Sequence, residues 1–484
     1  MHNLLPIFFQ GIVNGIAAFL LPCIFPLLPL TISFFTKSSA SRLGAIIKAL
    51  VYGLSIILIY TGFGLLITKL LGTNALNALA TNWIFNLSVF FLLIIFAISF
   101  FGAFEINLPS GLVNKMDELS GAKTWIGIFF MAFTLALVSF SCTGPVVGTL
   151  LVNAVASREY YSLTAGMLGF SLALALPFTL AAIFPSFLSN LPKSGAWLNS
   201  VKVFLGFIEL AASMKFLSSV DITYHLGILN RDVFLSIWIA LFFLLGLYLL
   251  GKIKFSHDSD LVFISVPRFF IALFVFSFAI YLIPGLWGAP LKPLSGILPP
   301  QSSQEFNLNS VGTLATNSNP KSALPKDRKL ANLLHEPPGF DGFFDYEEGL
   351  AYARKVNKPV LLDFTGNSCV NCRTMEQNVW THPEIKKIIN EDYILVSLYV
   401  DEKTELPINQ QYTSPFLGSK VRTVGNLNAD IEAKFFNTNS QPYYVPVDGN
   451  GKKLTEPMAF ESDIQKYKAF LIKGLDQFKA NNIK

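Results

Sequence analysis

The feature that most constrains this chain is a series of long apolar segments in which charged side chains are absent or rare. A membrane-spanning helix needs about 20 mostly apolar residues, because the bilayer core offers no hydrogen bonds to an exposed backbone. Only 14% of the 484 residues are charged, and most of these charges follow the last apolar segment. We therefore predict eight spans, at residues 4–35, 49–68, 83–104, 124–157, 160–187, 201–220, 233–251 and 269–288.

The distribution of basic residues between the spans predicts their orientation. Loops that face the cytoplasm carry an excess of Lys and Arg. The loops after the odd-numbered spans carry most of them, namely Lys37, Arg42, Lys48, Lys115, Lys123, Lys193, Lys252, Lys254 and Arg268. Both termini would then lie on the periplasmic side of a cell inner membrane. The first 30 residues lack the basic start and the cleavage site of a signal peptide, so we expect an uncleaved first span.

The composition changes after the last span. Residues 289–335 are rich in Pro, Ser, Asn and Gln, which predicts a flexible linker that buries little. We expect an all-α membrane domain of eight helices at 1–288, this linker, and a periplasmic α/β domain at 336–484. In the last domain the sequence predicts strands at 359–364, 393–400 and 443–447, a hairpin turn at 448–452 and a helix at 461–479.

Cys369 and Cys372 form a C-x-x-C pair between the predicted strand at 359–364 and a helical stretch. At a helix N-terminus, free N–H groups and the helix dipole favour a thiolate at the first cysteine. The second cysteine, one turn later, can resolve a mixed disulfide. Half a zinc site and an inert buried pair are the alternatives. Because no second C-x-x-C and no paired histidines lie nearby, the spacing favours redox exchange.

The stretch KPVLLDFTGNSCVNCRTMEQNVW (358–380) resembles the thioredoxin fold and, more narrowly, the C-terminal domain of the DsbD family of transmembrane thiol–disulfide reductases. The resemblance implies that Asp363 and Glu376 tune the cysteine pair. Buried carboxylates beside thiols would raise the thiol pKa values and shuttle protons. Without the family, Asp363 is interpreted as a polar strand residue and Glu376 as an exposed helix residue.

The thioredoxin fold also places a cis-proline against the disulfide. Pro442, just before the strand predicted at 443–447, matches that place. One residue departs from the pattern, because thioredoxins usually have an aromatic residue before the first cysteine and this chain has Ser368. The departure leaves open which partners the exposed thiol prefers.

Two further cysteines lie deep inside predicted spans. Cys23 and Cys142 fall in spans one and four, and each is followed three residues later by a proline, Pro26 or Pro145. Three spans separate the two copies, so they run in opposite directions, which predicts an inverted repeat of spans 1–3 and 4–6. Each proline should break its helix, and the half-helix N-terminus created there favours a thiolate.

The alternative for a membrane cysteine is a small hydrophobic residue without a redox role. The matched pair, however, is similar to the membrane domain shared by DsbD and CcdA, a resemblance that implies a disulfide between Cys23 and Cys142.

Span six also contains Glu209 with Lys202 and Lys215. Intramembrane ionisable residues are functional candidates, and Glu209 would either form a structural ion pair with a lysine or move protons.

These features together predict a membrane protein-disulfide reductase that carries two electrons from cytoplasm to periplasm. The resemblance implies cytoplasmic thioredoxin as the reductant, fed by NADPH, and periplasmic thiol–disulfide proteins as acceptors, including factors for cytochrome c maturation. The redox disulfides themselves would be the only cofactors, because each step is thiol–disulfide exchange. DsbD proteins usually carry a further N-terminal periplasmic domain, and this chain starts at its first span, so we expect a fragment or a separate protein in that role.

Two other classes of membrane protein remain possible from the sequence. A quinone-linked oxidase fused to a thioredoxin domain would need a C-x-x-C within the membrane bundle, where this chain has single cysteines. A transporter or membrane anchor that presents a thioredoxin-like domain would need no relay through Cys23 and Cys142. The net charge of +5 is spread along the chain without a basic tract, which argues against nucleic acid as a partner.

Overall fold

The structure, a computed structural model, describes residues 4–19, 46–62, 81–104, 128–129, 132–133, 160–183, 195–256, 258, 261, 263–306, 308 and 324–482. The chain forms two compact units. One unit comprises Met1–Ser213 and Leu244–Ala272, and the other comprises Met214–Phe243 and Leu273–Lys484. Cys23, Pro26, Cys142 and Pro145 lie outside the described residues, so the intramembrane disulfide stays a prediction.

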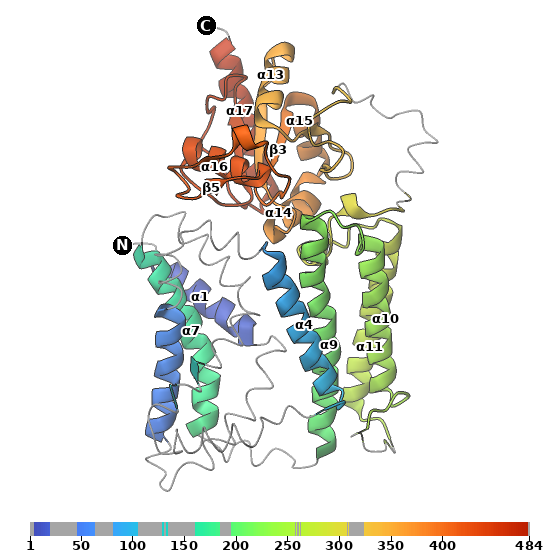
Figure 1. Ribbon diagram of the computed structural model, residues 1–484. Coiled ribbons are helices and arrows are strands. Elements are labelled where there is room, and N and C mark those ends of the chain that lie inside the picture. The colour runs from blue at the N-terminus through green and yellow to red at the C-terminus, as the bar shows by residue number, and fades with distance from the viewer. Residues whose placement is uncertain are drawn as a thin grey trace. The chain divides into compact units, whose positions relative to one another are not determined.

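Apolar helices dominate the N-terminal part of the chain (Figure 1). In the described part, four are long and apolar enough to cross a membrane: α4 (Trp83–Phe100), Asn199–Thr223 of α9 (Gly195–Thr223), α10 (Arg231–Leu249), and α11 (Val266–Leu282) with its extension η1 (Ile283–Trp287). Shorter apolar helices lie at Leu5–Ile16, Ile46–Gly62 and Thr164–Pro177. The fourth predicted span, 124–157, is almost entirely outside the described residues, so the eight-span count and the inverted repeat remain predictions.

Two of these helices pack unusually closely. In the first unit, α1 (Leu4–Phe19) lies against α7 (Tyr160–Ile183), and glycines line their contact. A Cβ atom at Gly11 would lie 2.3 Å from the carbonyl oxygen of Gly166, and one at Gly169 would lie 2.2 Å from that of Phe8. Small residues let the backbones of membrane helices approach each other, so these glycines set the distance between α1 and α7.

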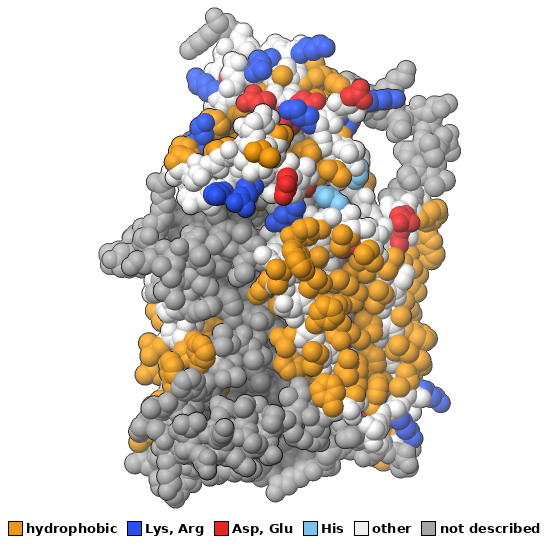
Figure 2. All heavy atoms as spheres, in the orientation of Figure 1, with side chains coloured by type: hydrophobic (Ala, Val, Ile, Leu, Met, Phe, Trp, Pro, Cys, Tyr) orange, Lys and Arg blue, Asp and Glu red, His pale blue; other side chains and the backbone are white. Residues whose placement is uncertain are grey.

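Exposed hydrophobic side chains support the assignment of a membrane domain. Phe269, Phe270, Leu273, Phe274 and Ile280 of α11 are all exposed. Figure 2 shows hydrophobic side chains gathered over the apolar helices, whereas Lys, Arg, Asp and Glu gather over the C-terminal domain. Soluble monomers rarely expose many large apolar side chains along one helix, whereas on a membrane-spanning helix such side chains form the surface that contacts lipid.

The start of the predicted linker is more ordered than its composition indicates. Leu291 and Leu298 are buried, in contrast to the expectation that this segment buries little. Arg231, at the start of α10, is fully buried and donates from Nη1 to the carbonyl oxygen of Pro299 at 2.6 Å. The side chain of Asp232 also accepts from the backbone N–H of Glu305. Carbonyl groups of this segment that no helix or strand uses therefore accept hydrogen bonds from the two terminal nitrogens of a buried guanidinium.

The C-terminal domain is built on a four-stranded sheet in the order β1-β3-β2-β6. In this sheet β1 (Gly342–Phe343) and β2 (Val360–Thr365) run parallel to β3 (Ile394–Tyr399), and β6 (Tyr443–Val447) pairs antiparallel to β2. A separate two-stranded sheet joins β4 (Tyr412–Thr413) to β5 (Lys420–Val421).

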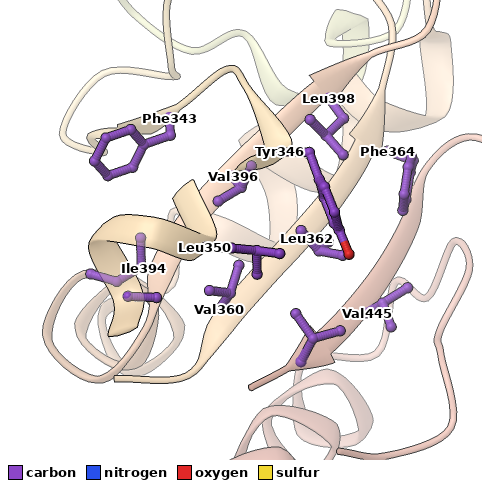
Figure 3. Close-up of a cluster of buried hydrophobic side chains, with 12 residues drawn as sticks. Phe343, Tyr346, Leu350, Val360, Leu362, Phe364, Ile394, Val396, Leu398 and Val445 are labelled. Atoms are coloured by element: carbon purple, nitrogen blue, oxygen red, sulfur yellow. The ribbon is translucent and has the colours of Figure 1, made fainter. Parts of the chain in front are cut away.

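Helices cover both faces of the four-stranded sheet. On one face, α13 (Tyr346–Val356) and α16 (Val424–Phe436) cover a core that includes Val360, Leu362 and Phe364 (Figure 3). The other face is covered by α14 (Val370–Met375), its π-helical continuation η4 (Glu376–Trp380), α15 (Pro383–Asp392) and α17 (Ile464–Asn482). Successive residues of a strand point to opposite faces, which places Leu361 and Asp363 on the α14 side.

The three predicted strands are confirmed within one residue, and the helix predicted at 461–479 is confirmed as α17, which begins and ends three residues later. The hairpin turn at 448–452 is also present, because Gly451 has a φ of +79° and Val447 forms an antiparallel bridge with Lys453. β1, α13, α16 and the β4–β5 hairpin were not predicted from the sequence. β1 and the hairpin strands have only two residues each, too few for an alternating pattern to show.

Replacing Leu362 with alanine tests the core shown in Figure 3. Leu362 is fully buried in β2, so Leu362→Ala should destabilise the C-terminal domain by about 2–5 kcal/mol. Ile408→Ala is the matched control, because Ile408 is 89% exposed and its truncation should change stability by less than about 0.5 kcal/mol. Hydrogen exchange of the β2 and β3 peptides in the full chain measures both effects. Equal effects of the two changes would contradict this assignment of the core.

Candidate functional site

The C-x-x-C pair lies where the parallel strands of the sheet end. Cys369 is the N-cap of α14 and forms a disulfide with Cys372, with the two Cα atoms 5.3 Å apart. The backbone N–H of Cys372 lies 3.1 Å from the Cys369 sulfur. Cys369 is half-buried, whereas Cys372 is fully buried. A partner can therefore reach the first sulfur and not the second, which is the asymmetry that thiol–disulfide exchange requires.

A carboxylate from the neighbouring strand fixes the loop before Cys369. Asp401, just after β3, accepts hydrogen bonds from the backbone N–H groups of Asn367 at 2.8 Å and Ser368 at 3.0 Å. It also accepts from the side-chain amide of Asn367. Asp401 was not predicted from the sequence, although the adjacent ends of two parallel strands could have indicated that it faces the loop after β2.

Both predicted acids are buried next to the helix that carries the cysteines. Asp363 is 3% exposed and Glu376 is 7% exposed, so the interpretation of Glu376 as an exposed helix residue is wrong. Burial raises the pKa of Glu376 to about 7, although Arg373 opposes the rise. Burial raises the pKa of Asp363 well above its usual range, and the neighbouring charges of Glu376 and Glu336 add to the effect.

Two residues that the sequence analysis did not select complete this buried cluster. Arg373, directly after Cys372, is buried and pairs through Nη2 with Oε1 of Glu376 at 2.7 Å. The Oε1 atom of Glu336 is also buried, and its carboxyl interacts electrostatically with Asp363, Glu376 and Arg373. Glu336 lies well before the C-x-x-C stretch in sequence, so no local motif indicates it.

The proline predicted beside the disulfide has the expected backbone. The Gln441–Pro442 peptide bond is cis, and Pro442 is buried. Tyr443 pairs with Phe364, which places Pro442 at the end of β2 that leads to Cys369. Buried Glu432 of α16 holds this turn by accepting from the backbone N–H of Ser440 and the side-chain amide of Gln441, each at 2.8 Å.

Ser368, the residue that departs from the thioredoxin pattern, contacts the C-terminal end of α9 within the second unit. Its hydroxyl lies 2.7 Å from the hydroxyl of Ser219 and 3.1 Å from that of Thr223. Just beyond α9, Nε2 of His225 lies 2.9 Å from Oε2 of Glu402. This hydrogen bond raises the pKa of His225. A serine at position 368 therefore provides polar contacts to two hydroxyl groups at the end of an apolar helix.

A polar cavity of about 260 Å³ adjoins the site in the same unit. Its walls include His225 and Asn230 from the turn after α9, and Asn367, Arg373 and Tyr399 from the C-terminal domain. His335, the neighbour of Glu336, also lines it. A cavity of this size has room for several water molecules, and Arg373 is the member of the buried cluster that lines it.

Glu209 differs from its expected structural role. It is fully buried in α9, yet neither of its carboxylate oxygens has a hydrogen-bond partner in the part of the chain that the structure describes. Lys202 is exposed, and neither Lys202 nor Lys215 forms an ion pair with Glu209 within the described residues. The structural ion pair is therefore not found there, and a role in proton movement stays a prediction.

Comparisons with known proteins agree with this geometry. Residues 3–220 match the family model of the cytochrome c biogenesis protein transmembrane domain, and residues 343–417 match a thioredoxin-like model. Thiol:disulfide interchange protein DsbD 2 of Pseudomonas aeruginosa is 27% identical over 75% of this chain and 56% of its own length. DsbD of Vibrio vulnificus is 26% identical over 81% of this chain and 58% of its own. The chain thus spans somewhat over half of the curated relatives it matches.

The buried acids predict how stability depends on pH. An acid whose pKa is higher in the folded than in the unfolded state makes the folded state bind more protons, so stability falls as the pH rises between the two values. For Glu376 that window runs from 4.5 to about 7, and Asp363 acts in the same direction. The C-terminal domain should lose on the order of 1–3 kcal/mol from about pH 5 to about pH 8.

Asp363→Asn should make this loss smaller, because the amide does not titrate. Asp476→Asn removes an exposed carboxyl of α17 and should leave the loss unchanged. Hydrogen exchange of the β2 and β3 peptides, measured in the full chain at each pH, gives the stability. An identical pH dependence for Asp363→Asn and the wild type would show that the Asp363 carboxyl is not protonated in the folded domain.

Proposed function

We propose, on the premise that this chain belongs to the DsbD family of thiol:disulfide interchange proteins, that it carries two electrons across a membrane by successive thiol–disulfide exchange. The observation that carries the proposal is the Cys369–Cys372 disulfide at the N-terminus of α14, with one accessible and one buried sulfur and with carboxyls behind it. The apolar helices and the transmembrane family match of residues 3–220 supply the membrane part.

The exchange steps balance without any group from outside the cysteine pairs. A thiolate of the Cys23 and Cys142 pair attacks the Cys369 sulfur, and Cys372 leaves and takes up a proton. The second membrane thiol then loses its proton and attacks the mixed disulfide. The membrane pair is oxidised to a disulfide, and Cys369 and Cys372 become thiols. The reduced pair then transfers two electrons to a disulfide of a partner in the same way.

The contact of Ser368 with Ser219 and Thr223 supports the step between the two cysteine pairs. These hydrogen bonds hold Ser368, the residue next to Cys369, at the end of α9, and α9 is long and apolar enough to span a membrane. We propose that this is the arrangement in which the C-terminal site receives electrons. The two hydroxyl contacts and the pair of His225 with Glu402 would hold the site there.

The basic residues of the loops and the DsbD family suggest the direction of electron flow and the redox partners. We propose that the odd-numbered loops face the cytoplasm, that cytoplasmic thioredoxin, reduced by NADPH, supplies the electrons, and that both termini are periplasmic in a cell inner membrane. Electrons then flow from a poise of roughly −270 mV toward a more oxidising compartment. Periplasmic disulfide proteins are the proposed acceptors. The printed description of the matching family, cytochrome c biogenesis, favours haem-attachment factors among them.

Replacing the membrane cysteines distinguishes a chain that relays electrons from one that only anchors its thioredoxin-like domain. If the chain relays electrons, Cys23→Ala and Cys142→Ala should each leave Cys369 and Cys372 oxidised in cells, because the electron source is cut. Alkylation of free thiols with a mass tag, followed by gel mobility, reports the state of each pair. Ser218→Ala in the same membrane domain is the control. Unchanged reduction of Cys369 and Cys372 in both cysteine variants would favour a transporter or anchor that carries an independent thioredoxin-like domain.

Ser368→Ala tests the proposed receiving arrangement. The change removes both hydroxyl contacts to α9 and leaves α9 itself unaltered. Loss of two hydrogen bonds, each worth about 0.5–1.5 kcal/mol, should slow reduction of Cys369 and Cys372 about 5-fold or more. Ser218→Ala is a matched control, because Ser218 is buried beside Ser219 and its hydroxyl has no hydrogen-bond partner among the described residues. Equal rates in the two variants would contradict the arrangement.

A further inference from the structure

The buried cluster beside α14 has more carboxyl groups than cations. Glu376 and Arg373 form an ion pair, and their side chains are 8% and 4% exposed. Asp363 and Glu336 interact with the same guanidinium, and within the described residues neither forms an ion pair with another cation. One positive charge can balance one carboxylate. If all three acids were ionised, the cluster would hold an uncompensated charge of −2, which burial makes very unfavourable.

The pattern of hydrogen bonds indicates which two acids hold protons in this disulfide state. Oδ1 of Asp363 and Oε1 of Glu336 are buried, and neither accepts a hydrogen bond in the part of the chain that the structure describes. A carboxyl group whose oxygen is buried and accepts no hydrogen bond is more stable in its protonated, neutral form. Burial raises the pKa of Glu336 to about 8; the charges of Glu376 and Asp341 add to the rise, while the Ser397 hydroxyl and Arg373 oppose it. Asp341 is itself paired with Arg328.

The backbone brings Glu336 close to the redox site. Gly342 of β1 leaves room for the carboxyl, because a Cβ atom there would lie 2.6 Å from Oε1 of Glu336. Ser397, which interacts with Glu336, pairs in register with Asp363 across β3 and β2. The adjacent residue His335 lines the polar cavity together with Arg373. Glu336 therefore interacts with the acid next to the cysteines and directly follows a residue that lines the cavity.

We infer that Glu336 is a positioning residue of the redox site, which acts through Asp363 by setting the pH at which Asp363 takes up a proton. The inference rests on the proposed thiol–disulfide exchange. When Cys369 is in a mixed disulfide with a partner, Glu336 keeps its proton and Asp363 is ionised. The Cys372 thiol gives its proton to the Asp363 carboxylate and attacks the Cys369 sulfur, and the partner leaves as a thiolate. Both acids are then neutral in the disulfide state, and when the disulfide is reduced again Asp363 returns the proton to Cys372.

Glu336→Gln tests this role through the pH profile of oxidation. The full chain, with Cys23 and Cys142 replaced by alanine, is reduced and then oxidised with glutathione disulfide, and the remaining thiols are trapped by alkylation at intervals. Two interacting acids titrate over a wider pH range than one. The wild-type profile should therefore be broad. In Glu336→Gln the profile should narrow, and its midpoint should fall by on the order of one pH unit, because Asp363 loses a like-charged neighbour.

Glu347→Gln is the matched control, because Glu347 is an exposed glutamate of α13, on the other face of the sheet. Its profile should coincide with that of the wild type. A double-variant cycle gives the sharper test: in an Asp363→Asn background, Glu336→Gln should cause no further shift. An unchanged profile in Glu336→Gln, or an equal shift in both backgrounds, would overturn the inference.

A further measurement covers the case in which Glu336→Gln does not fold. Infrared spectroscopy of the wild-type chain in the disulfide state should show that Asp363 and Glu336 both remain protonated near neutral pH, and a single protonated acid would overturn the inference. All these measurements use a chemical oxidant and a chain without the membrane cysteines. A failure of the transmembrane relay would therefore leave them unaffected, and the two proposals can fail separately.

Discussion

The parallel pairing of β2 with β3 is the constraint on which the redox site depends. Because both strands end at the same edge of the sheet, the loop that leads to Cys369 emerges beside Asp401, which binds two of its backbone N–H groups. The same register sets Asp363 opposite Ser397 on the face that α14 covers. A shift of one residue would turn Asp363 to the opposite face of the sheet and take its carboxyl away from the cysteines.

Burial then determines the chemistry of the groups that this register brings together. The carboxyls of Asp363 and Glu336 keep protons at a pH where exposed acids lose them, because burial raises their pKa values and the one guanidinium of the cluster is paired with Glu376. Glu376 begins the π-helical segment that continues α14. Such segments are rare and often mark functional sites, and here the segment begins at an acid of the cluster.

Local patterns in the sequence were sufficient for much of this architecture. The strands β2, β3 and β6 are short apolar runs next to turn residues, and the C-x-x-C pair identified the start of α14. Asp363, Glu376 and Pro442 were found through the family resemblance, because each occupies a fixed place relative to the cysteines or a strand. The apolar helices were visible from length and charge alone, although the intramembrane cysteines lie outside the described residues.

What the sequence did not indicate depends on contacts between distant segments. Glu336 and Asp401 reach the site from separate parts of the chain, and Ser219 meets Ser368 across 149 positions. The packing of Leu291 and Leu298 was hidden by a composition typical of linkers, because the buried Arg231 that holds this segment belongs to another helix. Single-sequence patterns report local preference, and these contacts are determined by tertiary packing.

The burial of Cys372 has a consequence for the order of the proposed exchange steps. Only the Cys369 sulfur can be approached, so in the proposed relay the membrane cysteines that deliver electrons and the protein that removes them must react at the same atom. Each must leave before the other can attack. The proposed turnover is therefore a ping-pong sequence, in which an excess of acceptor protein occupies the position that the membrane pair needs.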